Sequence, residues 1–289
     1  MTLDVEEQYR ELESRTVFLI LNYLTYDLTL QLVDAINADA RYANVTILVV
    51  DNCSPNESGE VLSSWAHEKG FVFIQNNSNA GYASGNNVGL RWAEEHGFKY
   101  ALILNNDVII NGPDCDGNLL ELAKLLEANK SYGVLGPRVL RPNGSREDPV
   151  AFRGSLLDLT IGYPAFYRKR KNFHPSQHLC EYYRPQGCCM MLNLSAMREC
   201  DYMDEHTFLY SEEEILAERL LRIGKSCGYC TDVSIIHNHS VTVRKAFSRA
   251  GAATQVCKSY AYYLGEYRNF NPISTALCVA VMWIVRFVR

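Results

Sequence analysis

The sequence predicts an α/β fold with a mixed, mainly parallel sheet flanked by helices, followed by a helical segment at the C-terminal end. Three observations support this fold class. Strand-like and helix-like stretches alternate through the first 110 residues, the strand-like stretches are apolar almost throughout, and each of them ends in polar residues. Strands that are apolar on both faces are typical of parallel sheets covered by helices on each side. Strand–helix–strand units of this kind cross over in the right-handed sense.

The elements follow one another regularly in the first half of the chain. Runs rich in β-branched and aromatic residues predict strands at 16–23, 45–52, 71–76 and 100–107, and the patterns between them predict helices at 28–36, 57–67 and 86–95. The second half predicts strands at 132–140, 188–193 and 232–239, and an amphipathic helix at 209–224 that Gly224 would end. Residues 141–184 are expected to form a polar, arginine-rich loop. Because we find neither an internal repeat nor a low-complexity linker, we expect one compact domain.

Composition excludes several classes of protein. The chain has 289 residues, of which 47% are hydrophobic, so it can bury a large core. The net charge is -5 and the basic residues are scattered, apart from "RKRK" at 168–171, so nucleic-acid binding is not expected. The ten cysteines are spread through predicted core strands without a preceding signal segment, which indicates a reducing, cytoplasmic compartment. Cys227 and Cys230 could form a redox pair, but their place favours buried strand cysteines.

The C-terminal stretch from Thr275 has two interpretations. It is apolar for about a dozen residues and then carries Arg286 and Arg289. This is shorter than the roughly 20 residues that cross a bilayer. Trp283 and the arginines suit a helix lying in the interface of an anionic membrane, and a terminal helix packed on the domain explains the pattern equally well. The abrupt end would also fit a longer chain that had been cut.

Polar side chains with ligand chemistry follow four predicted strands. The first strand ends near Asn22, the second at Asp51, the third runs into "NNSNAGYASGNN", and the fourth ends at Asn105, Asn106 and Asp107. A simple turn could explain any one of these clusters. Ligands of parallel sheets bind beyond the carboxyl ends of the strands, so four such ends together favour a binding site.

Two of these strand ends have chemistry suited to a nucleotide. Asp51 could accept hydrogen bonds from a ribose hydroxyl or a base, or it could cap the following helix. In the segment that begins at Asn79, Gly81 permits close backbone approach, and a helix beginning near Asn86 would offer free N–H groups to an anion. The segment is neither GxGxxG nor GxxxxGK[ST], so an ordinary dinucleotide or ATP site is not expected.

A divalent cation could bind at the end of the fourth strand. Asp107, with Asn105 two residues away, could hold Mg²⁺ or Mn²⁺ against a diphosphate, because such sites take one or two protein oxygens plus phosphates and waters. His237 and His239 end the last predicted strand and share one of its faces, so both could point into the same cavity. Ordinary core or surface histidines are the alternative.

Three successive glutamates, Glu212, Glu213 and Glu214, open the predicted helix after "FLYS". Acidic residues at a helix N-terminus are favourable with the helix dipole, which is a purely structural explanation. The aromatic and apolar residues before them would partly desolvate one carboxylate and raise its pKa toward values useful for a general base.

The ordered set "VVDN", "NxGYASGNNxG", "LNND", "DEHTFLYSEEE" and "IIHNHS" resembles the family 2 glycosyltransferases of the GT-A fold, particularly the bacterial rhamnosyltransferase-like members that build surface polysaccharides such as O-antigen. The resemblance covers residues 17–240. It implies that Asp51 contacts the nucleoside and that Asp107 is the last residue of the metal-binding DXD motif. It also implies that the Glu212/Glu213 pair supplies the catalytic base, with Glu213 at the usual base position, and that His237 lies near the diphosphate and metal.

Two positions depart from the family pattern. Asn105 stands where the first Asp of the DXD motif is usual, and this weakens the case for metal binding. Glu213 stands where Asp is common, so the carboxylate is one methylene longer.

The resemblance implies an inverting glycosyltransferase that moves a sugar such as rhamnose from a dTDP- or UDP-sugar to a glycan or lipid-linked acceptor. Residues 15–115 would bind the nucleotide sugar, 116–240 would bind the acceptor and carry out catalysis, and 241–289 would form a helical segment that can contact the inner face of the membrane. Two alternatives are a non-catalytic nucleotide-sugar-binding module and a sugar nucleotidyltransferase, although the glycine-rich, basic signature of the latter is missing near the first strand.

Acceptor recognition is expected within residues 146–186. Its aromatic residues could stack on sugars or belong to the core; they are Phe166, Tyr167, Phe173, Tyr182 and Tyr183. The "RKRK" block could meet a membrane or a lipid diphosphate, or it could be a solvated loop.

Overall fold

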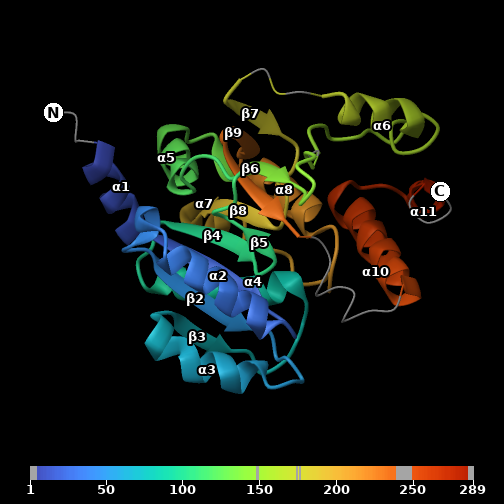
Figure 1. Ribbon diagram of the computed structural model, residues 1–289. Helices are drawn as coiled ribbons and strands as arrows, with labels where there is room; N and C mark the ends of the chain where they lie inside the picture. The colour runs from blue at the N-terminus through green and yellow to red at the C-terminus, as the bar shows by residue number, and fades with distance from the viewer. Residues whose placement is uncertain (1–4, 148–149, 174, 176, 239–248, 286–289) are drawn as a thin grey trace.

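The computed structural model describes residues 5–147, 150–173, 175, 177–238 and 249–285. A nine-stranded sheet with the order β3-β2-β1-β4-β8-β6-β9-β5 forms its centre, and β7 pairs with β9 (Figure 1). The strands are β1 (Thr16–Asn22), β2 (Thr46–Asp51), β3 (Val72–Gln75), β4 (Tyr100–Asn105), β5 (Val108–Ile109), β6 (Tyr132–Leu140), β7 (Leu179–Tyr182), β8 (Cys189–Asn193) and β9 (Ser226–His237).

Helices precede, connect and follow these strands. The helices up to β8 are α1 (Val5–Ser14), α2 (Tyr26–Asn37), the 3₁₀ turn η1 (Ala40–Tyr42), α3 (Ser58–Lys69), α4 (Tyr82–Glu95), α5 (Leu120–Ala128) and α6 (Tyr163–Lys171). The later helices are α7 (Leu194–Glu199), α8 (Glu212–Arg222), α10 (Arg249–Tyr262), the π-helical turn η2 (Tyr263–Tyr267) and α11 (Pro272–Trp283).

The sheet is mixed and mainly parallel, as predicted. Strands β3, β2, β1 and β4 are parallel neighbours, and β8 runs antiparallel between β4 and β6. In the parallel part, Asn22 of β1 stands beside Asp51 of β2, and Leu21 stands beside Asn105 of β4. The register therefore brings three strand ends to one edge of the sheet.

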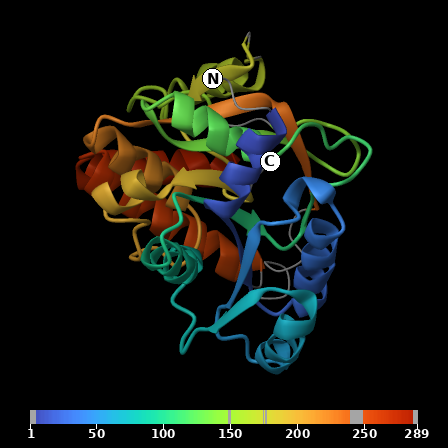
Figure 2. The ribbon, with the colours of Figure 1, turned by 90° about the vertical axis from the view of Figure 1, so that its left-hand side faces the viewer.

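Helices cover both faces of the sheet because successive side chains of a buried strand point to opposite sides. Phe18 and Ile20 of β1 belong to a core cluster that includes α2 and α5, whereas Val17 and Leu19 belong to a second cluster with α4 and α8. These four side chains are fully buried. The two clusters thus lie on opposite faces of the sheet, and Figure 2 shows α2 and α4 on opposite sides of the parallel strands.

The second half of the chain differs from the prediction in two places. Residues 141–184 contain helix α6 and strand β7, which pairs with β9 and is anchored there by buried Tyr182. Strand β9 begins at Ser226, so Cys227 and Cys230 are buried strand residues, as expected. His239 lies outside the described residues.

The C-terminal helices pack against the domain through a third apolar cluster. This cluster joins Leu159 and Phe166 to Ile215 of α8, Tyr263 of η2 and Cys278 of α11. The packing interpretation of the C-terminal stretch is therefore confirmed for one face of α11. Among the described residues, no helix has the length and apolar character needed to span a membrane.

A buried carboxylate ties this C-terminal segment to the loop before α8. Asp204 is 4% exposed and accepts hydrogen bonds from the hydroxyl groups of Tyr262 and Tyr267 and from the backbone N–H of His206, while Arg219 lies 3.4 Å away. Burial alone would raise the pKa of Asp204, but these hydrogen bonds outweigh burial and lower the pKa to about 2.

We predict that Asp204→Asn lowers the free energy of unfolding by about 2–4 kcal/mol at pH 7, because several donors lose a charged acceptor. A folded-state pKa below the unfolded value stabilises the protein above about pH 4, and this contribution disappears as the pH falls to about 2. Urea unfolding at pH 7 and pH 3 measures both effects. An equal difference between variant and parent at the two pH values would contradict the assignment.

Candidate active site

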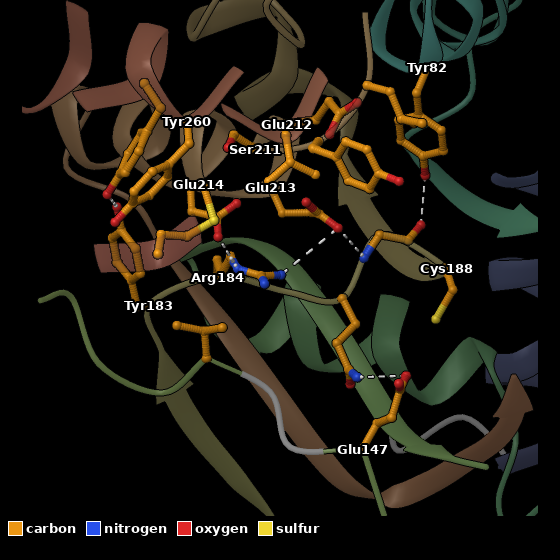
Figure 3. Close-up of a pocket in the computed structure, with 18 of the residues that line it drawn as sticks. Tyr82, Glu147, Tyr183, Arg184, Cys188, Ser211, Glu212, Glu213, Glu214 and Tyr260 are labelled. Atoms are coloured by element: carbon orange, nitrogen blue, oxygen red, sulfur yellow. Dashed lines mark hydrogen bonds and ion pairs between the residues drawn. The ribbon is translucent and has the colours of Figure 1, made fainter. Parts of the chain in front are cut away.

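An open cleft of about 1190 Å³ lies at the carboxyl edge of the parallel strands. Asp107, which follows β4, and Glu213 of α8 both line this cleft. Figure 3 shows Glu212, Glu213 and Glu214 in its middle, with Tyr82 and Cys188 on one side and Tyr183 and Tyr260 on the other. The structure thus brings together the two carboxylates on which the predicted chemistry depends.

Asn22 and Asp51 support the cleft but do not line it. Both are fully buried, and Nδ2 of Asn22 donates to Oδ1 of Asp51 at 2.7 Å. The carboxylate also accepts from N–H and Oγ of Ser54 at 2.9 and 2.7 Å and from Nε2 of Gln75 at 2.7 Å. A nucleoside would have to displace one of these donors to reach Asp51, so direct contact between Asp51 and the nucleoside stays a prediction.

Asn105 and Asn106 line the same cleft in different ways. The backbone N–H of Asn105 donates to the carbonyl of Cys188 at 2.9 Å, which joins the end of β4 to the start of β8. The Asn106 amide points inward and donates to Oγ1 of Thr25 and of Thr29, both at 2.9 Å. Asn106 is therefore a brace between β4 and α2, and its amide N–H groups are already bonded within the protein.

Asp107 faces His237 across the end of β9. Oδ1 of Asp107 lies 3.2 Å from Nε2 of His237, and Oε2 of Glu147 lies 3.7 Å from Nδ1 of the same ring. Burial would lower the pKa of His237, but hydrogen bonds with Asp107, Cys188 and Glu147 outweigh burial and raise the pKa to about 12. Glu147 was not predicted as a site residue, because the stretch "SRED" around it has no distinguishing feature other than its charges.

A divalent cation fits this corner through few protein ligands. Oδ1 of Asp107 is buried and, apart from the His237 ring, has no hydrogen-bond partner among the described residues. No cluster of three or more His, Cys, Asp or Glu side chains suited to a metal occurs in the part of the chain that the structure describes. This pattern matches Mg²⁺ or Mn²⁺ sites in which substrate phosphates and waters complete the shell.

Helix α4 begins earlier than predicted, and this corrects the assignment of Asn86. The helix starts at Tyr82, so Asn86 lies one turn inside it, is fully buried and donates to the carbonyl of Tyr82 at 3.0 Å. Asn86 neither opens the helix nor lines the cleft. Gly85 lies inside the helix, at a point where a Cβ would lie 2.7 Å from the side chain of Leu21 in β1.

Gly81 and Asn79 do lie at the cleft. Oδ1 of Asn79 accepts from the N–H of Gly81 at 3.0 Å, which closes a tight turn before α4. Gly81 has a φ of 109°, and a Cβ there would lie 2.2 Å from the carbonyl oxygen of Phe208. The next N–H, that of Tyr82, donates to the same carbonyl at 3.0 Å. Gly81 thus allows the start of α4 to approach the segment that leads into the glutamates.

The glutamates enter the cleft from a strained turn. Tyr210 and Ser211 have φ values of 74° and 67°, which are unusual for residues with side chains and cost on the order of 1 kcal/mol each. Glu212 is 5% exposed, and its Oε1 has no hydrogen-bond partner among the described residues. Burial, followed by the charge of Glu213, raises the pKa of Glu212 well above its usual range.

Glu213 has an environment that suits a base. Its Oε1 accepts from the N–H of Gly187 at 3.1 Å and lies 3.9 Å from Nη1 of Arg184. Burial raises the pKa of Glu213, while the charge of Arg184 opposes this rise. Arg184 also pairs with Glu214 at 2.8 Å, and Tyr82 donates to the carbonyl of Gly187 at 2.6 Å. No role was predicted for Arg184 or Tyr82, although Arg184 lies in the expected acceptor segment 146–186 and Tyr82 lies in "NxGYASGNNxG".

The expected sugar-stacking residues divide into two groups. Phe166, Tyr167 and Tyr183 line the cleft. Phe173 and Tyr182 instead pack on each other, with ring centroids 5.7 Å apart, and do not line it.

Comparison with known proteins agrees with this geometry. Residues 18–196 match the family model described as Glycosyl transferase family 2. The chain belongs to the family 2 glycosyltransferases. The match ends before the glutamates of α8, so it does not test their roles.

Two curated relatives carry related activities. The low-salt glycan biosynthesis hexosyltransferase Agl10 of Haloferax volcanii is 30% identical over 254 residues, which cover 87% of this chain and 72% of that protein. The N-acetylglucosaminyl-diphospho-decaprenol L-rhamnosyltransferase of Mycobacterium tuberculosis is 26% identical over 146 residues, which cover 45% of this chain and 46% of the relative. The chain is therefore an enzyme of the glycosyltransferase class.

Solved structures show the same fold. A mannosyltransferase from Pyrobaculum calidifontis in complex with GDP-Man and Mn²⁺ has a TM-score of 0.61 and 12% identity over 98% of this chain and 76% of that one. TarS of S. aureus in complex with UDP-GlcNAc has a TM-score of 0.56 and 13% identity over 94% and 73% of the two chains. The predicted GT-A fold is confirmed.

We predict that Gly81→Ala lowers the free energy of unfolding by about 2–4 kcal/mol, because the added Cβ meets the Phe208 backbone at a φ that side chains avoid. Gly97→Ala is the matched control, since Gly97 also has a positive φ but no atom within 4 Å of the added Cβ. The control should cost about 1 kcal/mol in urea unfolding. Equal losses would show that contact with Phe208 is unimportant.

Proposed function

We propose that this enzyme moves a hexosyl or 6-deoxyhexosyl group, such as rhamnosyl, from a nucleoside diphosphate sugar to a hydroxyl group of a glycan or lipid-linked acceptor in polysaccharide synthesis, with inversion. One observation carries the proposal: Asp107 and Glu213 line the same cleft. The names of the two relatives support the sugar class, and the solved complexes with GDP-Man and UDP-GlcNAc support a nucleotide-sugar donor.

Glu213 is the proposed general base. It accepts the proton of the acceptor hydroxyl, whose oxygen forms the new bond to the anomeric carbon. The bond between that carbon and the diphosphate oxygen breaks, and its electron pair leaves with the nucleoside diphosphate. Attack from the face opposite the diphosphate inverts the configuration through an oxocarbenium-like state without a covalent enzyme intermediate.

Glu213 suits this role better than Glu212. A base must be ionised, and both Gly187 N–H and Arg184 stabilise the ionised form of Glu213. Burial and the adjacent charge of Glu213 raise the pKa of Glu212 and so disfavour its ionised form. Of this pair, Glu213 is therefore the glutamate with groups beside it that stabilise the ionised form.

Asp107 would hold the divalent cation at the diphosphate end of the cleft, and His237 beside it could join as a ligand only by releasing its ring proton as the metal binds. A bound Mg²⁺ or Mn²⁺ would neutralise charge on the departing diphosphate. Gly81 and Asn105 would line the path of the donor, since both line the cleft.

We predict that Glu213→Gln lowers kcat by about 10²- to 10⁴-fold and leaves donor affinity within about twofold, because it removes the proton acceptor without changing shape. Turnover is measured on a panel of dTDP-, UDP- and GDP-sugars, and donor affinity by calorimetry. Glu212→Gln is the matched control and should lose less than about tenfold, since glutamine keeps the shape of the side chain and the proposed mechanism moves no proton to Glu212. Full activity in Glu213→Gln would remove Glu213 from the mechanism.

The pH dependence tests the same assignment. Burial raises the pKa of Glu213 above its usual 4.5, so wild-type kcat should fall with decreasing pH already above that value as the base becomes protonated. Arg184→Gln should move the acidic limb of the pH–kcat profile to higher pH, because the variant lacks the positive charge that opposes the rise in the pKa of Glu213. A profile that does not move would show that Arg184 does not act on the base.

We predict that Asp107→Ala removes the metal dependence of donor binding. In the wild type, EDTA should weaken donor affinity at least about tenfold, because the cation links the carboxylate to the diphosphate. In Asp107→Ala, affinity should already be weak and should not change with EDTA. Asp114→Ala, an exposed acidic residue nearby in sequence, should respond as the wild type does. An unchanged EDTA response in Asp107→Ala would refute the assignment.

A further inference from the structure

The cleft extends well beyond the glutamates, toward helices that the proposed chemistry leaves unexplained. Its far end is lined by Tyr163, Phe166 and Arg170 of α6, Tyr260 of α10 and Met282 of α11. Figure 1 shows α6, α10 and α11 on one side of the molecule. We call this part, defined by these five residues, the far end of the cleft.

Arg170 is a cation that forms no ion pair with the residues that the structure describes. Its Nε is buried and has no hydrogen-bond partner among them. Its carbon Cζ lies 5.9 Å from the ring centre of Phe166. Burial, followed by the charge of Arg184, lowers the pKa of Arg170. Arg170 is partly buried. Since a partly buried charge without an ion-pair partner is costly, its place in an open cleft favours an anionic ligand.

The other arginines of the cleft are compensated. Arg184 pairs with Glu214 at 2.8 Å, Arg141 lies 3.7 Å from Glu147, and Nε of Arg268 lies 3.6 Å from Glu218. Each of these three arginines therefore has a carboxylate within 4 Å inside the protein. Arg170 differs from them because no carboxylate among the described residues is within ion-pair distance of it.

Arg170 also differs from its neighbours in "RKRK". Arg168, Lys169 and Lys171 are exposed, as expected for a solvated helix end, and they do not line the cleft. Only Arg170 of this block lines it. The block therefore divides into an outward-facing basic surface and one inward-facing guanidinium.

Arg170 lies on the side of the glutamates away from Asp107 and His237. The charges and hydroxyl groups that act on Arg170 include Tyr163, Glu214 and Tyr260, and Tyr260 lies on the side of the glutamates away from Cys188 (Figure 3). His237 and Asp107, which mark the end of the cleft proposed for the diphosphate, lie on the same side of the glutamates as Cys188. An anion at Arg170 is thus separated from the donor diphosphate by the base, as an acceptor must be.

Exposed apolar side chains occur in the same segments as residues that line the far end of the cleft. Tyr167 lines the cleft and is 49% exposed, and Trp283 and Ile284 are exposed beside the lining residue Met282. Ile161, two residues from the lining residue Leu159, is 82% exposed. An uncompensated cation next to such a surface matches a molecule in which an anionic group is joined to an apolar chain.

We infer that Arg170 binds the phosphate or diphosphate of a lipid-linked acceptor, with the apolar chain lying over α6 and α11. This inference rests on the proposed function, because it names the acceptor class for the same cleft. A guanidinium can bind a phosphate through two parallel hydrogen bonds, so Arg170 would fix the distance between the lipid and the acceptor hydroxyl at Glu213.

The test measures binding without turnover. Farnesyl diphosphate, inorganic pyrophosphate and farnesol are titrated into the full chain in EDTA, which silences metal-dependent binding at the donor end, and affinity is measured by calorimetry. Farnesyl diphosphate should bind at least about tenfold more tightly than either of the other probes. Arg170→Gln should weaken it by about 10- to 100-fold. Arg168→Gln, in the same helical turn but exposed, should stay within about twofold.

A second variant guards against misfolding. Arg170→Lys keeps the charge but loses the planar fork, so it should bind farnesyl diphosphate with intermediate affinity. Melting temperatures of all variants should match the wild type. Unchanged affinity in a folded Arg170→Gln would overturn the inference. Equal affinity for pyrophosphate would assign the site to free phosphate, and equal affinity for farnesol would leave only apolar binding; either result also overturns it.

This readout is independent of the proposed activity. Asp107→Ala should bind farnesyl diphosphate as the wild type does, because the probe does not use the donor end. A protein that binds the probe but turns over no sugar nucleotide would refute the proposed function alone. A protein that turns over sugar nucleotides but shows no dependence on Arg170 would refute this inference alone.

Discussion

The register of the parallel strands is the constraint on which the site depends. Asn22 lies beside Asp51 and Leu21 beside Asn105, so three strands end at one level. A shift by one residue would turn every side chain of a strand to the opposite face. The Asn22–Asp51 hydrogen bond and the Asn106 amide reinforce this register from within the protein. The polar residues nearest the core therefore hold the edge, and those that follow them face the cleft.

The second constraint is the packing of α8 against the C-terminal segment. Glu218 of α8 is 4% exposed. Its carboxylate accepts two hydrogen bonds of 2.7 Å from Arg153 and one of 2.6 Å from the hydroxyl of Tyr183. The same Tyr183 hydroxyl lies 2.6 Å from that of Tyr263. Because Glu213 lies in the first turn of the same helix, these contacts also set the position of the proposed base. The C-terminal segment is thus part of the cleft wall.

Charge is distributed unevenly along the cleft. At the Asp107 end, the carboxylates of Asp107 and Glu147 lie beside His237 and Arg141, and a cation bound to Asp107 would link this end to a diphosphate. In the middle, Arg184 shares its charge between Glu213 and Glu214. At the far end, Arg170 is uncompensated by the described residues and lies among aromatic rings. A metal-bound donor and an anionic, partly apolar acceptor would thus meet at the glutamates from opposite sides.

The order of the elements, the mainly parallel sheet and the polar residues at the strand ends could be predicted from the sequence alone. These features depend on the periodicity of apolar residues and on turn-forming residues, and both can be read from residues that are close together in the chain. Only the tertiary structure decided that Asn22, Asp51 and Asn86 are buried, because burial depends on which distant side chains, such as those of Thr29, Ser54 and Gln75, reach them. The roles of Arg184 and Arg170 could likewise be assigned only from the tertiary structure. Whether a guanidinium has an ion-pair partner depends on carboxylates in segments that are far away in the chain.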